Sequence, residues 1–126
     1  MKPTLKLSVL DGEYAIHRFA PKSDIPTLTG NFISITQTED ELSIVCAAGI
    51  PVDREKSEAG WACIKMLGPR DFGLTGILAR IASVLAQAEI SIFAISTYDT
   101  DYILVKKEKL SSAQQSLEKA GYIFEN

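Results

Sequence analysis

The chain has 126 residues, 46% of them hydrophobic and 23% charged, enough for one ordinary hydrophobic core or two very small ones. Its formal charge of −3 at pH 7 and the lack of a basic stripe argue against a nucleic-acid partner. No stretch approaches the ~20 apolar residues of a membrane span, and Met1–Thr4 lacks the apolar core of a signal peptide. We therefore expect a cytoplasmic protein with no membrane partner.

Short strands are expected at the start of the chain. Asp11-Gly12 separates the apolar runs 5–10 and 14–19, and this dipeptide predicts a hairpin turn between two paired strands. Pro21 and Pro26 interrupt any long helix before the next apolar run. The first half is therefore expected to contain strands without a full first helix.

An internal duplication is indicated by a shift of sixty positions. This shift places residues 36–45 over residues 96–105 without a gap, and both copies read as an apolar run, an acidic turn and a second apolar run. The polar segment 51–60 is expected to separate the two halves, although a short helix there is equally compatible. We place the junction near Glu58 to Gly60, which gives an N-terminal domain 1–58 and a C-terminal domain 61–126.

The second half reads as βαββαβ. Strands are predicted at 61–67, 91–96, 102–106 and 122–124, and helices at 74–87 and 112–120. Ser111 begins an S-x-x-Q capping box, and Gly121 fits the residue just past a helix end. Two helices on one face of a four-stranded antiparallel sheet form the ferredoxin-like arrangement, an α+β fold.

A glycine-punctuated turn leads into the first predicted helix. Phe72, Gly73 and Leu74 offer backbone N–H groups at the helix N-terminus, where a carboxylate is favoured. The alternative is that Asp71 simply caps the helix.

A second polar cluster, Ser96 to Asp101, falls at a strand end and the following turn. Its hydroxyls and carboxylates suit a ligand carrying an ammonium or guanidinium group, and the alternative is an ordinary solvated turn.

Catalytic and metal-binding chemistry has little support in the sequence. His17 is the only histidine and is expected to be an exposed or hydrogen-bonded strand residue, while Cys46 and Cys63 are expected to be buried small hydrophobes. A bridge between the two cysteines is the open alternative. We expect no metal and no cofactor, because the chain offers neither ligand spacing nor a nucleophile with a base.

The runs 68–79 and 95–105 resemble ACT domains, small βαββαβ modules that bind amino acids and regulate enzymes. Their sequence is most similar to that of the bacterial tandem ACT proteins related to the vertebrate cytosolic arginine sensors. The resemblance implies ferredoxin-like ACT domains in tandem, with ligands held between two ACT units. It also implies two walls of a ligand site, the first formed by Pro69, Asp71, Phe72, Gly73, Leu74 and Thr75 and the second by Ser96, Thr97, Tyr98 and Asp99. The N-terminal unit departs from the pattern because it lacks a glycine loop before a helix.

The sequence thus predicts a non-catalytic regulatory protein that binds an amino acid. Because Asp71 lies near the helix N-terminus, a zwitterion with its cationic part on the Asp71 side fits the site. Exposed sheet edges predict a homodimer or larger assembly, and a self-sufficient monomer is the alternative. The competing functions are an interaction module with a vestigial ligand site and, least favoured, an enzyme that uses Asp99 and Asp101.

Overall fold

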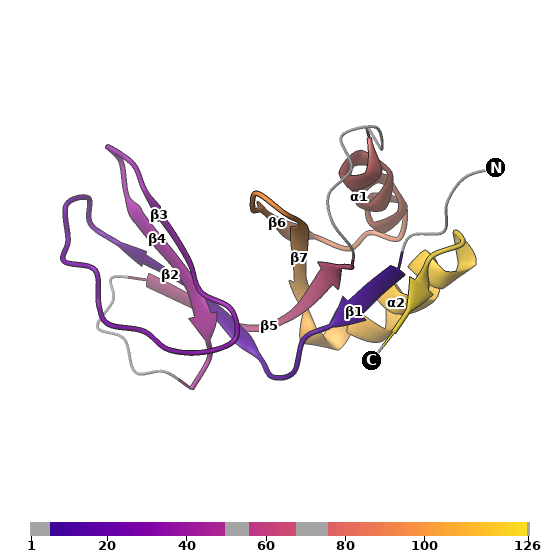
Figure 1. The fold of residues 1–126 in the computed structure, drawn as a ribbon, viewed down its shortest axis with the longest axis horizontal. Coiled ribbons are helices and arrows are strands. Elements are labelled where there is room, and N and C mark those ends of the chain that lie inside the picture. Colours follow the sequence, from indigo (N-terminus) through magenta and orange to yellow (C-terminus); the bar gives the residue numbers. More distant parts are fainter. Residues whose placement is uncertain (1–5, 50–55, 68–75, 126) are drawn as a thin grey trace. The chain divides into compact units, whose positions relative to one another are not determined.

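The computed structural model describes residues 6–49, 56–67 and 76–125. The chain divides into two compact units (Figure 1). The C-terminal unit comprises Met1–Asp11 and Ala62–Asn126, and the N-terminal unit comprises Gly12–Trp61.

The C-terminal unit places helices against a mixed sheet, an α+β architecture. Its sheet follows the order β6-β7-β5-β1-β8, in which β8 runs parallel to β1 and β1 runs antiparallel to β5. Its elements are β1 (Lys6–Val9), the second part of β5 (Lys56–Met66), α1 (Ile77–Gln87), β6 (Ile92–Ser96), β7 (Asp101–Lys106), the 3₁₀ turn η1 (Lys107–Lys109), α2 (Leu110–Lys119) and β8 (Ile123–Phe124).

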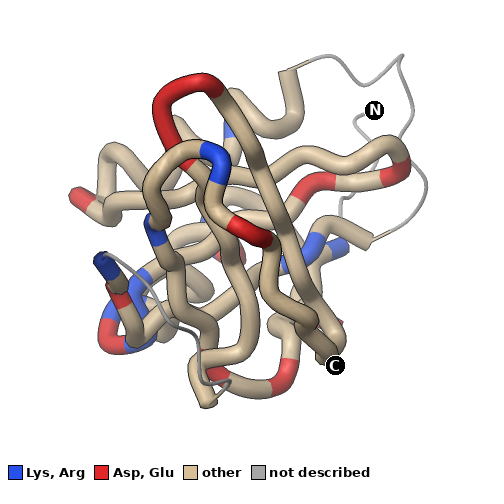
Figure 2. Tube along the Cα trace, turned by 90° about the vertical axis from the view of Figure 1, so that its left-hand side faces the viewer, with Lys and Arg blue, Asp and Glu red and all other residues tan. Residues whose placement is uncertain are grey.

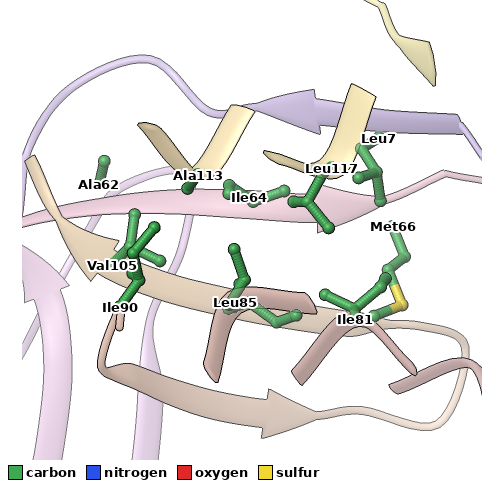
Figure 3. Packing of buried hydrophobic residues seen from close by; sticks show 11 residues of the cluster. Leu7, Ala62, Ile64, Met66, Ile81, Leu85, Ile90, Val105, Ala113 and Leu117 are labelled. Atoms are coloured by element: carbon green, nitrogen blue, oxygen red, sulfur yellow. The ribbon is translucent and has the colours of Figure 1, made fainter. Parts of the chain in front are cut away.

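One core joins both helices to one face of this sheet. The helices contribute Ile81, Leu85, Ala113 and Leu117, which lie against alternate residues of β5 such as Ile64 (Figure 3). Alternation along a strand turns every second side chain to the same face, so both helices cover the same side. The predicted apolar stripe of the first helix is confirmed by this packing.

The predicted hairpin between the first two strands is wrong. β1 pairs with β5, Leu7 opposite Met66, while β2 (Tyr14–Phe19) pairs with β4 and with the first part of β5. Gly12, at φ +96°, still lies in a bend of the chain. The long strand β5 offers pairing to both β1 and β2, and Leu7 becomes completely buried in the helix-covered core. The first strand therefore falls within the C-terminal unit.

The N-terminal unit is a four-stranded sheet in the order β3-β4-β2-β5, with no helix among its described residues. Its further strands are β3 (Ser34–Gln37) and β4 (Leu42–Ala47). Phe19, Leu42, Ile44 and Cys46 form a buried cluster. The connection 20–33 is held at its end by Tyr14, whose hydroxyl donates to Asn31 Oδ1 at 2.9 Å.

The predicted junction at Glu58 to Gly60 lies inside a strand. β5 begins at Lys56 and pairs with β2 through Ser57 and Glu58, and a bulge near Gly60, at φ +85°, shifts the register. The residues look like a linker because their side chains are exposed, yet their backbone pairs with β2. The alternative of a helix there is excluded for residues 56–60.

Of the two capping predictions for the second helix, one is confirmed and one is wrong. Gly121 is confirmed as the residue past α2, with φ +104° and its N–H donating to Glu118 O at 3.0 Å. The capping box at Ser111 is wrong, because η1 runs directly into α2 and Lys109 is the N-cap. Ser111 therefore lies within the helix.

Candidate functional site

The turn between β6 and β7 is fixed by hydrogen bonds within itself. The N–H of Thr97 donates to Thr100 O at 2.8 Å, and its hydroxyl donates to the same oxygen at 3.0 Å. The hydroxyl also accepts from the N–H of Thr100 at 3.2 Å. Thr97, a predicted wall residue, thus shapes the turn with its side chain.

The β3–β4 turn repeats this chemistry. The N–H of Thr38 donates to Glu41 O at 2.9 Å, and the hydroxyl accepts from the N–H of Glu41 at 3.1 Å. The two turns correspond when Thr38 is aligned with Thr97, an offset of 59 positions (97 minus 38). This offset is one less than the sixty of the sequence comparison.

Thr100 anchors the β6–β7 turn to the end of β5. Its side chain is buried, and its hydroxyl donates to Met66 O at 2.6 Å. Met66 is the last residue of β5, two positions before the segment that leads toward α1. Sequence reasoning missed this contact, because a threonine within an acidic turn carries no local sign of a hydrogen bond to a residue 34 positions away.

The other residues of this predicted wall are exposed. Ser96 ends β6, and Tyr98 and Asp99 occupy the turn itself, with Tyr98 87% exposed. Three side chains at this edge of the sheet are therefore accessible to solvent.

In the sequence, the N-terminus of α1 follows the residues predicted to form the first wall of the ligand site. Gly76, at φ +87°, is the N-cap, and its carbonyl accepts from the N–H of Arg80 at 2.9 Å. The cap makes no side-chain hydrogen bond, and the first turn contains no acidic residue. The predicted residues Pro69, Asp71, Phe72, Gly73, Leu74 and Thr75 lie outside the described residues.

His17 is a buried strand residue whose ring nitrogen Nδ1 is hydrogen-bonded. Its Nδ1 lies 2.5 Å from Ser57 Oγ, across the β2–β5 pair.

Both cysteines are buried free thiols, which confirms their predicted role as small hydrophobes and excludes a bridge between them. Burial raises the pKa of both thiols, that of Cys63 to about 12.

The described residues contain no group of three or more His, Cys, Asp or Glu side chains suited to a metal ion. None of the described helices has the length and apolar character needed to cross a bilayer. Lysine and arginine positions are interspersed with aspartate and glutamate along the drawn chain (Figure 2).

A model of the ACT domain matches residues 56–119, from the first residue of β5 to the last of α2. The chain belongs to the ACT domain family. A second model, for an N-terminal domain, matches residues 12–53. The ACT domain match therefore includes all of β5, the strand in which the sequence placed the junction.

Two mammalian proteins are similar to parts of this chain. The human "Putative protein CASTOR3P" is 28% identical over 99 residues, covering 68% of this chain and 61% of the relative. "Cytosolic arginine sensor for mTORC1 subunit 1" of Bos taurus is 32% identical over 91 residues, covering 64% of this chain and 28% of the relative. The chain thus spans less than two thirds of the length of either relative.

Solved structures share the fold. The crystal structure of protein Atu0741 from Agobacterium tumefaciens has a TM-score of 0.90 and 40% identity, covering 98% of this chain and 94% of that one. Aspartokinase alpha and beta subunits have a TM-score of 0.67 at 14% identity, covering 94% of this chain and 98% of that one. The second likeness concerns the ACT-like fold alone.

Proposed function

We propose that this ACT domain protein is a non-catalytic regulator that binds a free amino acid at one edge of its C-terminal unit. The observation that supports it most is the hydrogen bond from Thr100 to Met66. This bond holds the exposed turn residues at the strand end from which the chain continues toward the N-terminus of α1. The bond supports the proposal because it ties the turn that carries Ser96, Thr97, Tyr98 and Asp99 to Met66, three positions before Pro69 in the sequence.

The chemistry of this edge suits a zwitterion. The first turn of α1 presents backbone N–H groups that have no intrahelical partner, and the absence of an acidic residue there leaves it favourable to a carboxylate. Asp99, exposed in the turn, supplies a negative charge for the ammonium group. A dianion gains less from this pairing of opposite charges.

The proposal includes a tandem, ferredoxin-like arrangement and self-assembly. The matching turns at Thr38 and Thr97 support a common origin for the two units. β6 is an edge strand of its sheet, with β7 as its one partner strand in the described part of the chain, and unpaired edges favour association. The name of the bovine relative supports action in the cytosol.

The test is thermal unfolding of the full chain in the presence of each of the twenty amino acids. A ligand at 100 times its Kd should stabilise the chain by about 2.7 kcal/mol, because it binds only the folded state. One or a few amino acids should raise the Tm. A flat response across the panel at millimolar concentrations would contradict the proposal and leave the interaction module as the better account.

A matched pair of variants locates the site. Asp99→Ala should remove most of the ligand-induced shift, because it deletes the proposed partner of the ammonium group. Asp40→Ala changes the corresponding residue of the β3–β4 turn and should leave the shift intact. Equal shifts in both variants would place the ligand elsewhere.

A further inference from the structure

A buried imidazole contacts an exposed hydroxyl in the N-terminal unit. His17 of β2 lies directly opposite Ser57 of β5 in the strand register, and Nδ1 is 2.5 Å from Oγ. His17 is 5% exposed, whereas Ser57 is exposed. The serine residue is thus exposed while the histidine that it contacts is buried, and the contact itself is partly buried.

This arrangement is that of a nucleophile beside a general base. In the tautomer that carries its proton on Nε2, the ring accepts the hydroxyl proton of Ser57 at Nδ1. A serine hydroxyl alone is a weak nucleophile, and a base within hydrogen-bonding reach removes its proton as the oxygen attacks. The ring is fixed by its burial between Ser57 and Ile44, its register partner on β4.

Among the described residues, the charged residues one register position from this pair lie on the other face of the sheet. Arg18 opposes Lys56 and Glu58 opposes Ile16, one position along from the His17–Ser57 pair. Because side chains alternate along strands, these charges point away from the face that carries the imidazole. On that face the register partners of His17 are the aliphatic Ile44 of β4 and the hydroxyl-bearing Ser57 of β5.

We propose that Ser57 is a modification site, a nucleophile that accepts an acyl group from an activated acyl compound, with His17 as its base. Ser57 Oγ forms a bond to the carbonyl carbon, and the bond from that carbon to the leaving oxygen breaks. The hydroxyl proton passes to His17 Nδ1 and then to the departing oxygen. The product is an acyl-serine near the start of β5, in the N-terminal unit.

The experiment treats the full chain with an alkyl fluorophosphonate, which reports activated serines. The Ser57 oxygen forms a bond to phosphorus, the phosphorus–fluorine bond breaks and fluoride leaves, while the proton passes to His17. Peptide mass spectrometry should place a single adduct on Ser57. Label found only on other residues, or no label, would overturn the proposal.

Matched variants test the role of each partner. Ser57→Ala should take no label, whereas Ser43→Ala, which removes a strand serine opposite Arg18, should label like the unmodified chain. His17→Gln should slow labelling about 100-fold, the size expected for loss of a general base. An unchanged rate in folded His17→Gln would overturn the role of the imidazole.

Because His17 is buried, a second measurement uses the unmodified chain. The labelling rate should rise with pH through one titration and then level off, as the imidazole loses its proton. A rate that grows with hydroxide concentration without levelling would contradict activation by His17.

Discussion

Glu89 holds a left-handed backbone conformation, at φ +59°, just past the end of α1. Its N–H donates to Ala86 O at 3.0 Å, and the N–H of Ile90 donates to Leu85 O at 2.9 Å, which is the Schellman pattern of a helix end. Glycine adopts this conformation without the steric cost of a Cβ atom. Glu89 therefore carries local strain in exchange for ending the helix.

Glu89→Gly should raise the free energy of unfolding by about 1 kcal/mol, because it relieves that strain at a position where no other role is evident. Urea denaturation measures the change. The matched control is Gly121→Glu, which introduces the same strain at the equivalent position of α2, at φ +104°, and should lower stability. A Glu89→Gly chain less stable than the original would contradict the strain argument.

At the scale of elements, α2 has lysine side chains at its N-terminus, where the helix dipole disfavours positive charge. Lys107 and Lys109, with the acidic Glu108 between them, stand in the turn that opens into the helix, where the positive end of the helix dipole lies. Lys119 stands in the last turn, where a positive charge is favourable. The charges at the two ends of α2 therefore act in opposite directions on its stability.

Lys109→Glu should stabilise the chain by about 0.3–1 kcal/mol at low ionic strength, and Lys119→Glu should destabilise it by a similar amount. Thermal unfolding at two salt concentrations measures both. The two effects should shrink together at high salt, because screening weakens a dipole interaction. Effects of the same sign in both variants would exclude the dipole as their cause.

The elements of the C-terminal unit could be predicted because their signals are local. The apolar stripe of α1 and Gly121 at the end of α2 follow from spacing within one or two turns. The pairing of β1 could not be predicted, since Asp11-Gly12 looks the same whether the strands beside it pair with each other or with a third strand. The chain divides between Trp61 and Ala62, next to the predicted Glu58 to Gly60 junction. That this junction is part of strand β5 could not be predicted, since exposed polar side chains do not show whether the backbone is paired.

The exposed residues of the candidate site could be predicted from the sequence, but the hydrogen bond that anchors their turn could not. Exposure of Ser96, Tyr98 and Asp99 follows from a polar turn between two apolar runs. The anchor at Thr100 depends on a hydrogen bond to Met66 that only the assembled sheet brings about. Local pattern therefore locates the exposed residues, and the folded sheet decides which residue holds them in place.

At the scale of the whole molecule, one buried thiol in each unit couples folding to pH. Burial raises the pKa of Cys46 and raises that of Cys63 from 9.0 to about 12. Unfolding exposes both groups to water, where the thiolate is well solvated and each thiol loses its proton at lower pH. The unfolded chain therefore binds fewer protons than the folded chain in alkaline solution.

Cys63→Ala should accordingly reduce the alkaline loss of stability. Below pH 9 the Cys63 thiol is protonated in both states and contributes no pH dependence, whereas between pH 9 and about 12 its ionisation favours the unfolded chain. The free energy of unfolding should fall there by up to about 1.4 kcal/mol per pH unit from this group. Urea denaturation from pH 8 to 11 should show a shallower fall in the variant. The lost packing at residue 63 lowers the free energy of unfolding by a similar amount at every pH, so it does not change the slope of that energy against pH. An unchanged slope in the variant would therefore mean that burial of this thiol does not oppose its ionisation.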